Sequence, residues 1–299
     1  AMASAVILLA VSANSFAQEL PKCEFRGAWL HIVGNKRIAT QTSSQLQEKL
    51  IATLDSLKLA GCNAVLFQVR PDADAFYDSK LEPWTRYLTG VQGKAPEPYW
   101  DPLAFAVEEC HKRGMELHAW INPYRFASSS TYKNNTDTDY PTTHPDWVQY
   151  CDQADIYILN PGNPEVRQRI VDVINDILDK YDVDGFIFDD YFYQSGYKDE
   201  FDDDFYAQNN PDGLSRGDWR RHQVNLMVQD VYNAIKARKP WCRFGIGPAG
   251  VAASDKNVAS KYGIPPCPDG SDWQYSDIYS EPIQWYKDSS LDYMAPQVY

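Results

Sequence analysis

Residues 183–193 read VDGFIFDDYFY, an apolar and aromatic run that contains two adjacent carboxylates. An apolar run of this length, without polar alternation, is typical of a strand buried on both faces of a parallel sheet. A segment with apolar residues at helical spacing precedes this run at 164–180, and another follows it at 219–238. A buried strand between two helices predicts an α/β protein with a parallel sheet.

The rest of the chain repeats this alternation. Apolar runs predict strands at 25–33, 64–69, 116–121, 185–191, 243–247 and 293–298, and amphipathic spacing predicts further helices at 44–59 and 102–113. No Gly-rich phosphate loop follows the first strand, and long loops at 71–100, 122–147 and 194–218 follow later strands. We therefore predict a (β/α)8 TIM-type barrel with its site in those loops, rather than an open doubly wound sheet.

The two ends of the chain carry predictions of their own. Only six strands are visible, so we expect one barrel domain at 18–299 that is truncated after the sixth strand. Residues 1–17 contain a short apolar run with small residues at Ser15 and Ala17, which predicts a signal peptide cleaved before Gln18. Because no basic region or initial Met precedes the run, we expect this leader to be clipped. The apolar run is too short for stable membrane insertion. Because a cleaved signal peptide directs a protein out of the cytoplasm, we predict export to the periplasm or cell envelope.

Composition narrows the class of partner. The chain carries 28 Lys and Arg against 41 Asp and Glu, a formal charge of −13, and such a surface repels the phosphates of nucleic acid. Aromatic residues make up 14% of the chain, with 9 Trp and 20 Tyr. Ring faces backed by carboxylates commonly hold sugars, although an aromatic-rich core explains the same count. We expect a glycan partner and no nucleic acid.

The cysteines and acidic runs give little support for a metal centre. The six cysteines show no C-x-x-C spacing and no nearby His, so we predict no zinc site and no other cofactor. Cys62, Cys110 and Cys242 lie in apolar segments and are expected to be free buried thiols. The acidic stretch 202–212 lacks the EF-hand spacing, so we favour a solvated loop over a calcium site there.

Strand parity places the strongest catalytic candidate. Side chains alternate between the two faces of a strand, so Asp189 shares the lumen face with Ile187 and Tyr191, while Phe186 and Phe188 face the helices. Asp189 also lies near the carboxyl end of this predicted strand, where barrel enzymes build their sites. The sequence therefore predicts a catalytic carboxylate at this rim.

Polar residues on other strands point to the same rim. The same parity rule collects a polar set near the carboxyl end of three further strands: Gln68 and Arg70, then His118, Trp120 and Asn122, then Gln297. We expect these residues to line one substrate-binding pocket with Asp189. The alternative is that they are lumen residues whose hydrogen bonds are satisfied within the protein.

Longer motifs identify a family resemblance. In chain order they are FRGAWLHIV, QVRPDADAFYDSKLEPWTRYLTG, ELHAWINPYRF, HPDWV, NPGNPEVRQRIVDVINDIL, VDGFIFDDYFY, DWRRHQVN, FGIGPAG and LDYMAPQVY. These motifs resemble the bacterial glycosyl-hydrolase-like family 10 over nearly the whole mature chain. The resemblance implies an envelope glycosidase that cleaves peptidoglycan strands stripped of their stem peptides. It also implies a barrel that continues beyond the last motif.

Glycoside hydrolysis generally needs two carboxyl groups, one to donate a proton and one to act as base or nucleophile. Asp189 is the first, and Arg70 or Asn122 is positioned to hold it ionised. Asp190 is adjacent, and repulsion between like charges raises one pKa, as an acid requires. The pair is also similar to the Asp-Asp pair of N-acetylglucosaminidases that use substrate assistance, in which the first Asp orients the acetamido group and the second is the acid. Parity opposes this role, because Asp190 starts out facing the helices, although the twist at a strand end often brings both carboxylates to the rim.

Other carboxylates are weaker candidates. Asp74 follows the second strand in DADAFY and is either part of the site or a turn cap, and Asp72 lies beside it. Glu82 either belongs to the site or fixes the loop around Trp84. Glu281 is expected to begin a helix and to be structural.

Exposed rings near strand ends are candidate sugar platforms. The set is Trp29, Trp84, Trp120, Tyr124, Tyr191 and Tyr193, of which Trp29 and Trp120 lie nearest to strand ends. Each of them either stacks on a sugar or belongs to the core. No residue pattern identifies a group that reads the lactyl substituent of muramic acid.

The sequence as a whole predicts a carboxylate-based glycoside hydrolase of a bacterial envelope glycan, with peptidoglycan first. A hydrolase of another polysaccharide and a glycan-binding barrel without catalysis remain alternatives. A metal-dependent hydrolase is disfavoured, because no H-x-H or H-x-x-E cluster occurs among the five His.

Overall fold

A computed structural model of the chain describes residues 24–35, 37–128, 140–268 and 270–298. The predicted signal peptide at 1–17 lies outside the described residues. Within the described ranges, no helix has the length and apolar character needed to cross a membrane.

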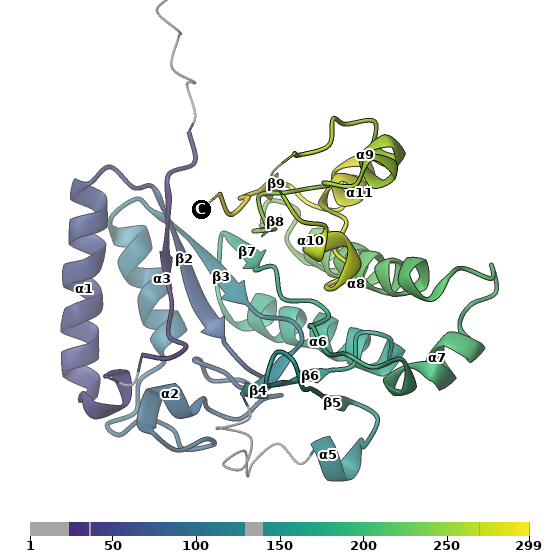
Figure 1. Ribbon diagram of the computed structural model, residues 1–299. Coiled ribbons are helices and arrows are strands. Elements are labelled where there is room, and N and C mark those ends of the chain that lie inside the picture. Colours follow the sequence, from purple (N-terminus) through teal and green to yellow (C-terminus); the bar gives the residue numbers. More distant parts are fainter. Residues whose placement is uncertain (1–23, 36, 129–139, 269, 299) are drawn as a thin grey trace, which may run out of the picture.

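The centre of the molecule is a curled sheet of six parallel strands (Figure 1). Their order is β1 (Gly27–Leu30), β2 (Ala64–Arg70), β3 (Glu116–Ile121), β7 (Gly185–Phe188), β8 (Arg243–Ile246) and β9 (Tyr293–Met294). All six predicted strands are confirmed, although several end earlier than predicted. The strand predicted at 185–191 ends at Phe188, and the one predicted at 293–298 ends at Met294. The sheet thus forms a curled half-barrel with β1 and β9 as its edges.

Long helices cover the outer face of this sheet (Figure 1). They are α1 (Ser43–Leu59), α3 (Pro102–Lys112), α6 (Pro164–Lys180) and α8 (Arg216–Arg238). Local sequence explains where three of them begin. Thr42 and Gln45 form a capping box at α1, while Asp101 and Asn163 cap α3 and α6 immediately before a Pro in the first turn. The predicted alternation of strands and helices is therefore confirmed.

Shorter elements occupy the connections. They are η1 (Ile38–Thr40), α2 (Arg86–Thr89), α5 (Tyr140–Thr143), η2 (Asp199–Phe201), α7 (Asp203–Gln208), α9 (Lys256–Tyr262), α10 (Trp273–Ser276) and α11 (Pro282–Lys287). A second, antiparallel sheet lies near the carboxyl end of β3, with order β4-β6-β5 (Figure 1). Its strands are β4 (Arg125–Ser128), β5 (Val148–Cys151) and β6 (Ile156–Leu159). The sequence analysis placed a loop at 122–147, so β4 corrects that prediction.

Side chains on the inner face meet across the curl of the main sheet. The His118 ring on β3 contacts Tyr293 on β9, with 2.7 Å between Nδ1 and the phenol oxygen. Phe25, just before β1, packs against the same Tyr293 with ring centroids 5.2 Å apart. Gly185 and Gly245 make room for these rings, because a Cβ on either glycine would overlap His118 or Tyr293. The inner face is therefore a packed lumen that joins the two edges of the sheet.

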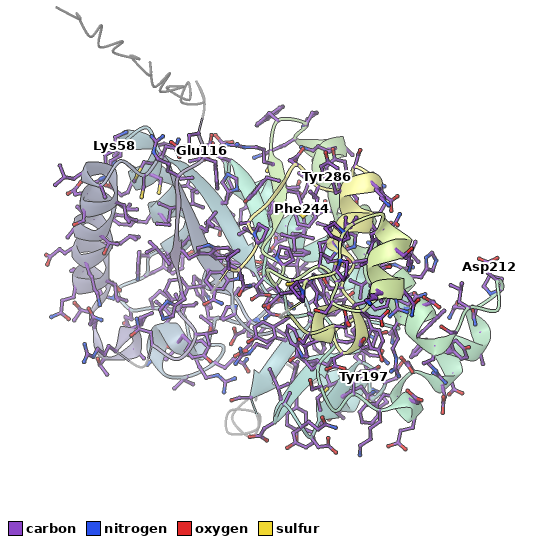
Figure 2. All side chains as sticks on the ribbon, turned by 45° about the horizontal axis from the view of Figure 1, so that its top comes forward. Lys58, Glu116, Tyr197, Asp212, Phe244 and Tyr286 are labelled. Atoms are coloured by element: carbon purple, nitrogen blue, oxygen red, sulfur yellow. The ribbon has the colours of Figure 1, made fainter. Side chains whose placement is uncertain are left out.

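Two minor predictions are corrected by the fold. Cys110 and Cys242 are buried free thiols as predicted, but Cys62 is only half-buried. Within the acidic stretch 202–212, Asp202 is buried rather than solvated, whereas Asp212 lies at the outer tip of its loop (Figure 2). Among the described residues, no group of three or more His, Cys, Asp or Glu is arranged to hold a metal ion.

Candidate active site

Asp189 follows β7 directly and is held by three N–H donors. Its Oδ2 accepts hydrogen bonds from the Trp120 indole at 3.2 Å and from the Asn122 amide at 3.3 Å. Its Oδ1 accepts the backbone N–H of Tyr191 at 3.4 Å. The side chains come from β3 and from the residue that follows β3. Parallel strands end at one edge of the sheet, so three partners from two strands converge on one carboxylate.

The pKa of Asp189 is raised to about 7, chiefly because burial disfavours the charged form. The neighbouring Asp190 raises it further, while the hydrogen bonds from Trp120 and Tyr191 act in the opposite direction. Only 6% of Asp189 is exposed, so water does little to stabilise its charge. Asp189 thus changes protonation in the range where a general acid or base works.

Asp190 lies at the same rim, half-buried beside Gln297. Burial raises the pKa of Asp190, and a hydrogen bond from the Gln297 amide partly offsets that rise. Gln297 also donates to the Gly247 carbonyl at 2.8 Å. Because β7 ends at Phe188, the strand alternation that was expected to turn Asp190 toward the helices does not extend to it. Asp189 and Asp190 are therefore both available at the rim.

Partly exposed rings border the carboxylate pair. Trp29 packs edge-on against Trp120, with ring centroids 4.8 Å apart and planes at 86°. Trp29 is 38% exposed and Tyr191 is 39% exposed, whereas Tyr124 and Tyr193 are completely buried. Trp29 and Tyr191 thus retain ring surface for a ligand, while Tyr124 and Tyr193 belong to the core.

Arg70 has a structural position rather than one beside Asp189. Its guanidinium makes two hydrogen bonds of 2.7 Å to Glu82 and donates to the carbonyls of Asn122 and Pro123. The side chain is 1% exposed. The expectation that Arg70 holds Asp189 ionised is corrected, because these partners occupy the guanidinium; Asn122 takes that place. Glu82 fixes its loop, one of the two roles expected of it.

Gln68 and His118 are also occupied within the protein. The Gln68 side-chain oxygen accepts backbone N–H groups of Ile32 and Val33 at 2.8 and 3.0 Å, which fixes the chain after β1. His118 is fully buried against Tyr293, and burial lowers its pKa to about 4. Both residues support the rim from inside the lumen. For them the alternative reading holds, in which lumen side chains form their hydrogen bonds within the protein.

The second-strand loop buries two carboxylates. Asp74 accepts a hydrogen bond from Gln92 at 3.2 Å, and its pKa is raised to about 7, first by burial and then by Asp72. Asp72 is fully buried, and its Oδ1 lies 2.9 Å from Nε of Arg125. Among the described residues no hydrogen bond joins Asp74 to Asp189. Asp74 thus lies within the supporting structure of the loop, and its predicted catalytic role stays untested.

Arg125 belongs to the site although no sequence pattern singled it out. This residue begins β4, its backbone N–H donates to the Asn122 side-chain oxygen at 3.0 Å, and its charge favours the ionised form of Asp189. Asn122 therefore bridges Arg125 and Asp189. The motif ELHAWINPYRF contains Arg125, but the strand β4 that orients this residue falls within the segment 122–147, which was predicted as a loop.

Helices over a curled parallel sheet, with a carboxylate pair where a central strand ends, define an α/β half-barrel with its candidate site at the carboxyl ends of the strands. The chain belongs to the family described as glycosyl hydrolase-like 10, whose model matches residues 24–299. The family resemblance predicted from the motifs is therefore confirmed.

Two curated relatives carry glycosyl hydrolase names. Glycosyl hydrolase YngK of Bacillus subtilis (strain 168) is 41% identical over 290 residues, which cover 92% of this chain and 54% of the relative. Glycosyl hydrolase DigH of Escherichia coli (strain K12) is 35% identical over 298 residues, which cover 92% of this chain and 65% of the relative. The chain thus spans 54% to 65% of the length of these relatives.

Solved glycosidases share the fold at low identity. The glycoside hydrolase domain of PgaB (BpsB) from Bordetella bronchiseptica matches with a TM-score of 0.58 and 11% identity, over 90% of this chain and 73% of that one. Alpha-L-fucosidase isoenzyme 2 from Paenibacillus thiaminolyticus matches with a TM-score of 0.54 and 15% identity, over 80% of this chain and 34% of that one. At these identities the likeness concerns the fold.

Proposed function

We propose that the protein is an exported glycoside hydrolase that cleaves peptidoglycan glycan strands lacking stem peptides, within the periplasm or cell envelope. The observation that carries the proposal is the carboxylate pair Asp189 and Asp190, buried at a strand end with raised pKa values. Membership of a glycosyl hydrolase-like family supports it. We further propose that the six described strands belong to a (β/α)8 barrel.

The two carboxylates have different surroundings and, in this proposal, different roles. Asp189 receives three N–H donors, so its orientation is fixed, and it positions the acetamido group of the sugar. Asp190 is more exposed, and with substrate bound the single proton of the pair lies on Asp190, from which the leaving oxygen takes it. Adjacent carboxyls with raised pKa values retain a proton between them to near neutral pH, as an acid at this position requires.

The proposed reaction proceeds in two steps. The acetamido oxygen attacks the anomeric carbon while the glycosidic oxygen leaves with the proton of Asp190. Asp189 stabilises the positive charge that develops on the acetamido group. A water molecule then adds to the anomeric carbon and returns a proton to Asp190, which restores the acetamido group. Trp29 and Tyr191 supply exposed ring faces on which the sugars stack.

The test uses the full-length protein and purified glycan strands with and without stem peptides, with products scored by mass spectrometry. Asp189→Asn and Asp190→Asn are each expected to reduce cleavage of stripped strands by about 100-fold or more. Asp203→Asn is the matched control, because the Asp203 side chain is 59% exposed and lies in α7. Circular dichroism checks that each variant folds.

Each contrary outcome has a distinct meaning. Release of no product from either glycan contradicts the peptidoglycan proposal. Full activity of Asp190→Asn with loss in Asp189→Asn contradicts the paired mechanism but not the hydrolase. Tight glycan binding without cleavage by the wild-type protein indicates a binding barrel instead.

A further inference from the structure

Arg125 is linked to Asp189 through Asn122, and the proposed reaction leaves its guanidinium unused. Its side chain is 20% exposed, whereas the side chain of Asp72 beneath it is completely buried. The Arg125 Nε lies 2.9 Å from Asp72 Oδ1. Asp72 therefore holds the buried Nε edge of the guanidinium, and the exposed part of the side chain lies beyond that edge.

The free edge of this guanidinium has the geometry of a carboxylate receptor. A guanidinium can engage one partner through Nε and another through its terminal nitrogens, which form a planar fork that matches two carboxylate oxygens. Asp72 is engaged through Nε. Among the described residues, no hydrogen bond or ion pair is made by the terminal nitrogens of Arg125. One edge of the fork is thus available to a ligand.

The position of Arg125 relative to the reacting groups is fixed by Asn122. Because the Asn122 oxygen accepts the Arg125 backbone N–H, its NH2 group must be the one that faces Asp189. One buried amide thus bridges β4 and the carboxylate that follows β7. Arg125 thus begins one side chain away from the carboxylate at which the proposed function places the sugar.

We propose that Arg125 binds a carboxylate on the substrate, and that this contact makes the site selective for strands whose lactyl groups are free. The inference rests on the proposed function and adds the group that reads the substrate. Hydrolysis of the amide between the lactyl group and the stem peptide leaves a carboxylate, which a guanidinium binds in a bidentate manner. With the peptide in place the same position is a neutral amide with a bulky substituent, and the pairing is lost.

Asp72 is the positioning residue in this arrangement. It fixes the rotamer of Arg125 from below, so little side-chain entropy is lost when the ligand binds. It also balances the charge of Arg125 in the absence of ligand, since an unpaired buried charge is costly.

The experiment compares two forms of the same stripped glycan, one with free lactyl carboxylates and one with these groups converted chemically to carboxamides. The measured quantity is the ratio of kcat/KM for the two substrates, with the full-length protein. A wild-type ratio of about 10 to 100 in favour of the carboxylate is expected, the effect typical of one charge-assisted contact. Arg125→Gln lowers this ratio to near one, and Arg125→Lys gives a value between the two.

The control is Arg238→Gln, since Arg238 lies on α8 with its side chain 42% exposed, and it leaves the ratio unchanged. A wild-type ratio near one overturns the inference while cleavage of both substrates upholds the proposed function. A wild-type ratio retained in Arg125→Gln also overturns it. Absence of product from both substrates instead contradicts the proposed function itself. If Arg125→Gln fails to fold, the wild-type and Arg125→Lys ratios decide.

Discussion

Asp189 shows how a functional carboxylate acts on the stability of the fold. Its pKa rises from 3.8 to about 7 because the side chain is buried. Below about pH 4 the folded and unfolded chains both carry the proton, so burial brings no charge penalty. Between about pH 4 and pH 7 the unfolded chain has lost this proton while the folded chain retains it, so the free energy of unfolding falls as pH rises. Above about pH 7 the penalty is constant.

Asp189→Asn removes this titration. The variant is expected to be more stable than wild type at pH 8 by roughly 2 to 4 kcal/mol, and to lose this advantage near pH 4. Urea unfolding at both pH values measures the difference. Asp182→Asn is the control, since the Asp182 side chain is 77% exposed. An advantage of equal size at both pH values contradicts the assignment of a raised pKa to Asp189.

The Arg70–Glu82 ion pair is expected to behave as a buried pair. Both side chains are almost inaccessible, so Glu82→Gln leaves a buried guanidinium without its counter-charge and is expected to cost about 3 to 5 kcal/mol. Arg70→Met combined with Glu82→Leu is expected to recover a large part of that loss. The exposed pair Arg26 and Glu24 provides the comparison, where a single change costs less than about 1 kcal/mol. Denaturant unfolding of the four proteins distinguishes these cases.

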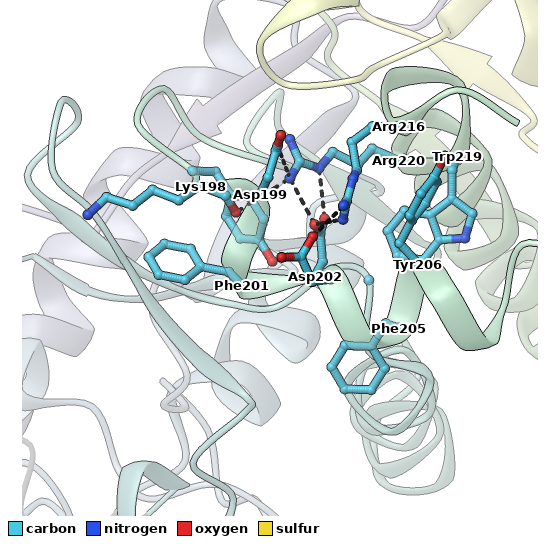
Figure 3. A network of polar contacts seen from close by, with 12 residues as sticks. Lys198, Asp199, Phe201, Asp202, Phe205, Tyr206, Arg216, Trp219 and Arg220 are labelled. Atoms are coloured by element: carbon cyan, nitrogen blue, oxygen red, sulfur yellow. Dashed lines mark hydrogen bonds and ion pairs between the residues drawn. The ribbon is translucent and has the colours of Figure 1, made fainter.

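At the scale of elements, a buried clamp anchors the loop that follows β7. Asp202 lies between Arg216 and Arg220, which donate to both of its oxygens (Figure 3). Arg220 also bonds the phenol of Tyr279, at 3.1 Å, in the region that follows β8. The clamp therefore ties the β7 loop both to α8 and to the next loop of the rim.

Asp202→Asn is expected to loosen this loop. The change removes a charge that is completely buried, so we expect a loss of about 3 kcal/mol and faster amide hydrogen exchange across 198–215. Asp203→Asn is the matched control, because Asp203 also pairs with Arg216 but is 59% exposed. Equal amide exchange rates across 198–215 in the two variants would contradict the statement that Asp202 anchors this loop.

The elements were largely predictable because their signals are local. Apolar runs and capping residues such as Thr42 and Asn163 lie within a few positions of the helices and strands that they define. The short strand β4 was not predictable, because its pairing with β6 comes from the fold of residues about 30 positions apart. The role of Arg125 was hidden for the same reason.

Predictions for the site failed where a partner was distant in sequence. Asp189 was found because it directly follows an apolar run, and such a run is a local signal of a strand. The ion pair between Arg70 and Glu82 was not predicted, because nothing in the sequence spacing shows that the loop between them folds back onto β2. Parity gave no valid position for Asp190, because β7 ends at Phe188 and the point where a strand ends depends on its neighbours.

At the scale of the whole molecule, the packed lumen joins the sheet into one unit. Tyr293 on the edge strand β9 contacts His118 on β3, although β7 and β8 lie between them. Phe25 at the other edge also packs against Tyr293. Damage to this contact is therefore expected to act on the whole sheet and not on one strand.

Gly245→Ala tests this coupling. A Cβ on Gly245 would overlap the ring of Tyr293, and we expect a loss of about 2 to 4 kcal/mol in a single cooperative transition. In a Tyr293→Ala background the same change is expected to cost less than about 1 kcal/mol, because the ring is absent. Gly217→Ala is the control, since Gly217 lies in α8 and its Cβ would come no closer than 3.3 Å to the side chains of Arg221 and Tyr279. Two separate unfolding transitions in Gly245→Ala, or an equal cost in the Tyr293→Ala background, would show that the strands are not coupled through the lumen.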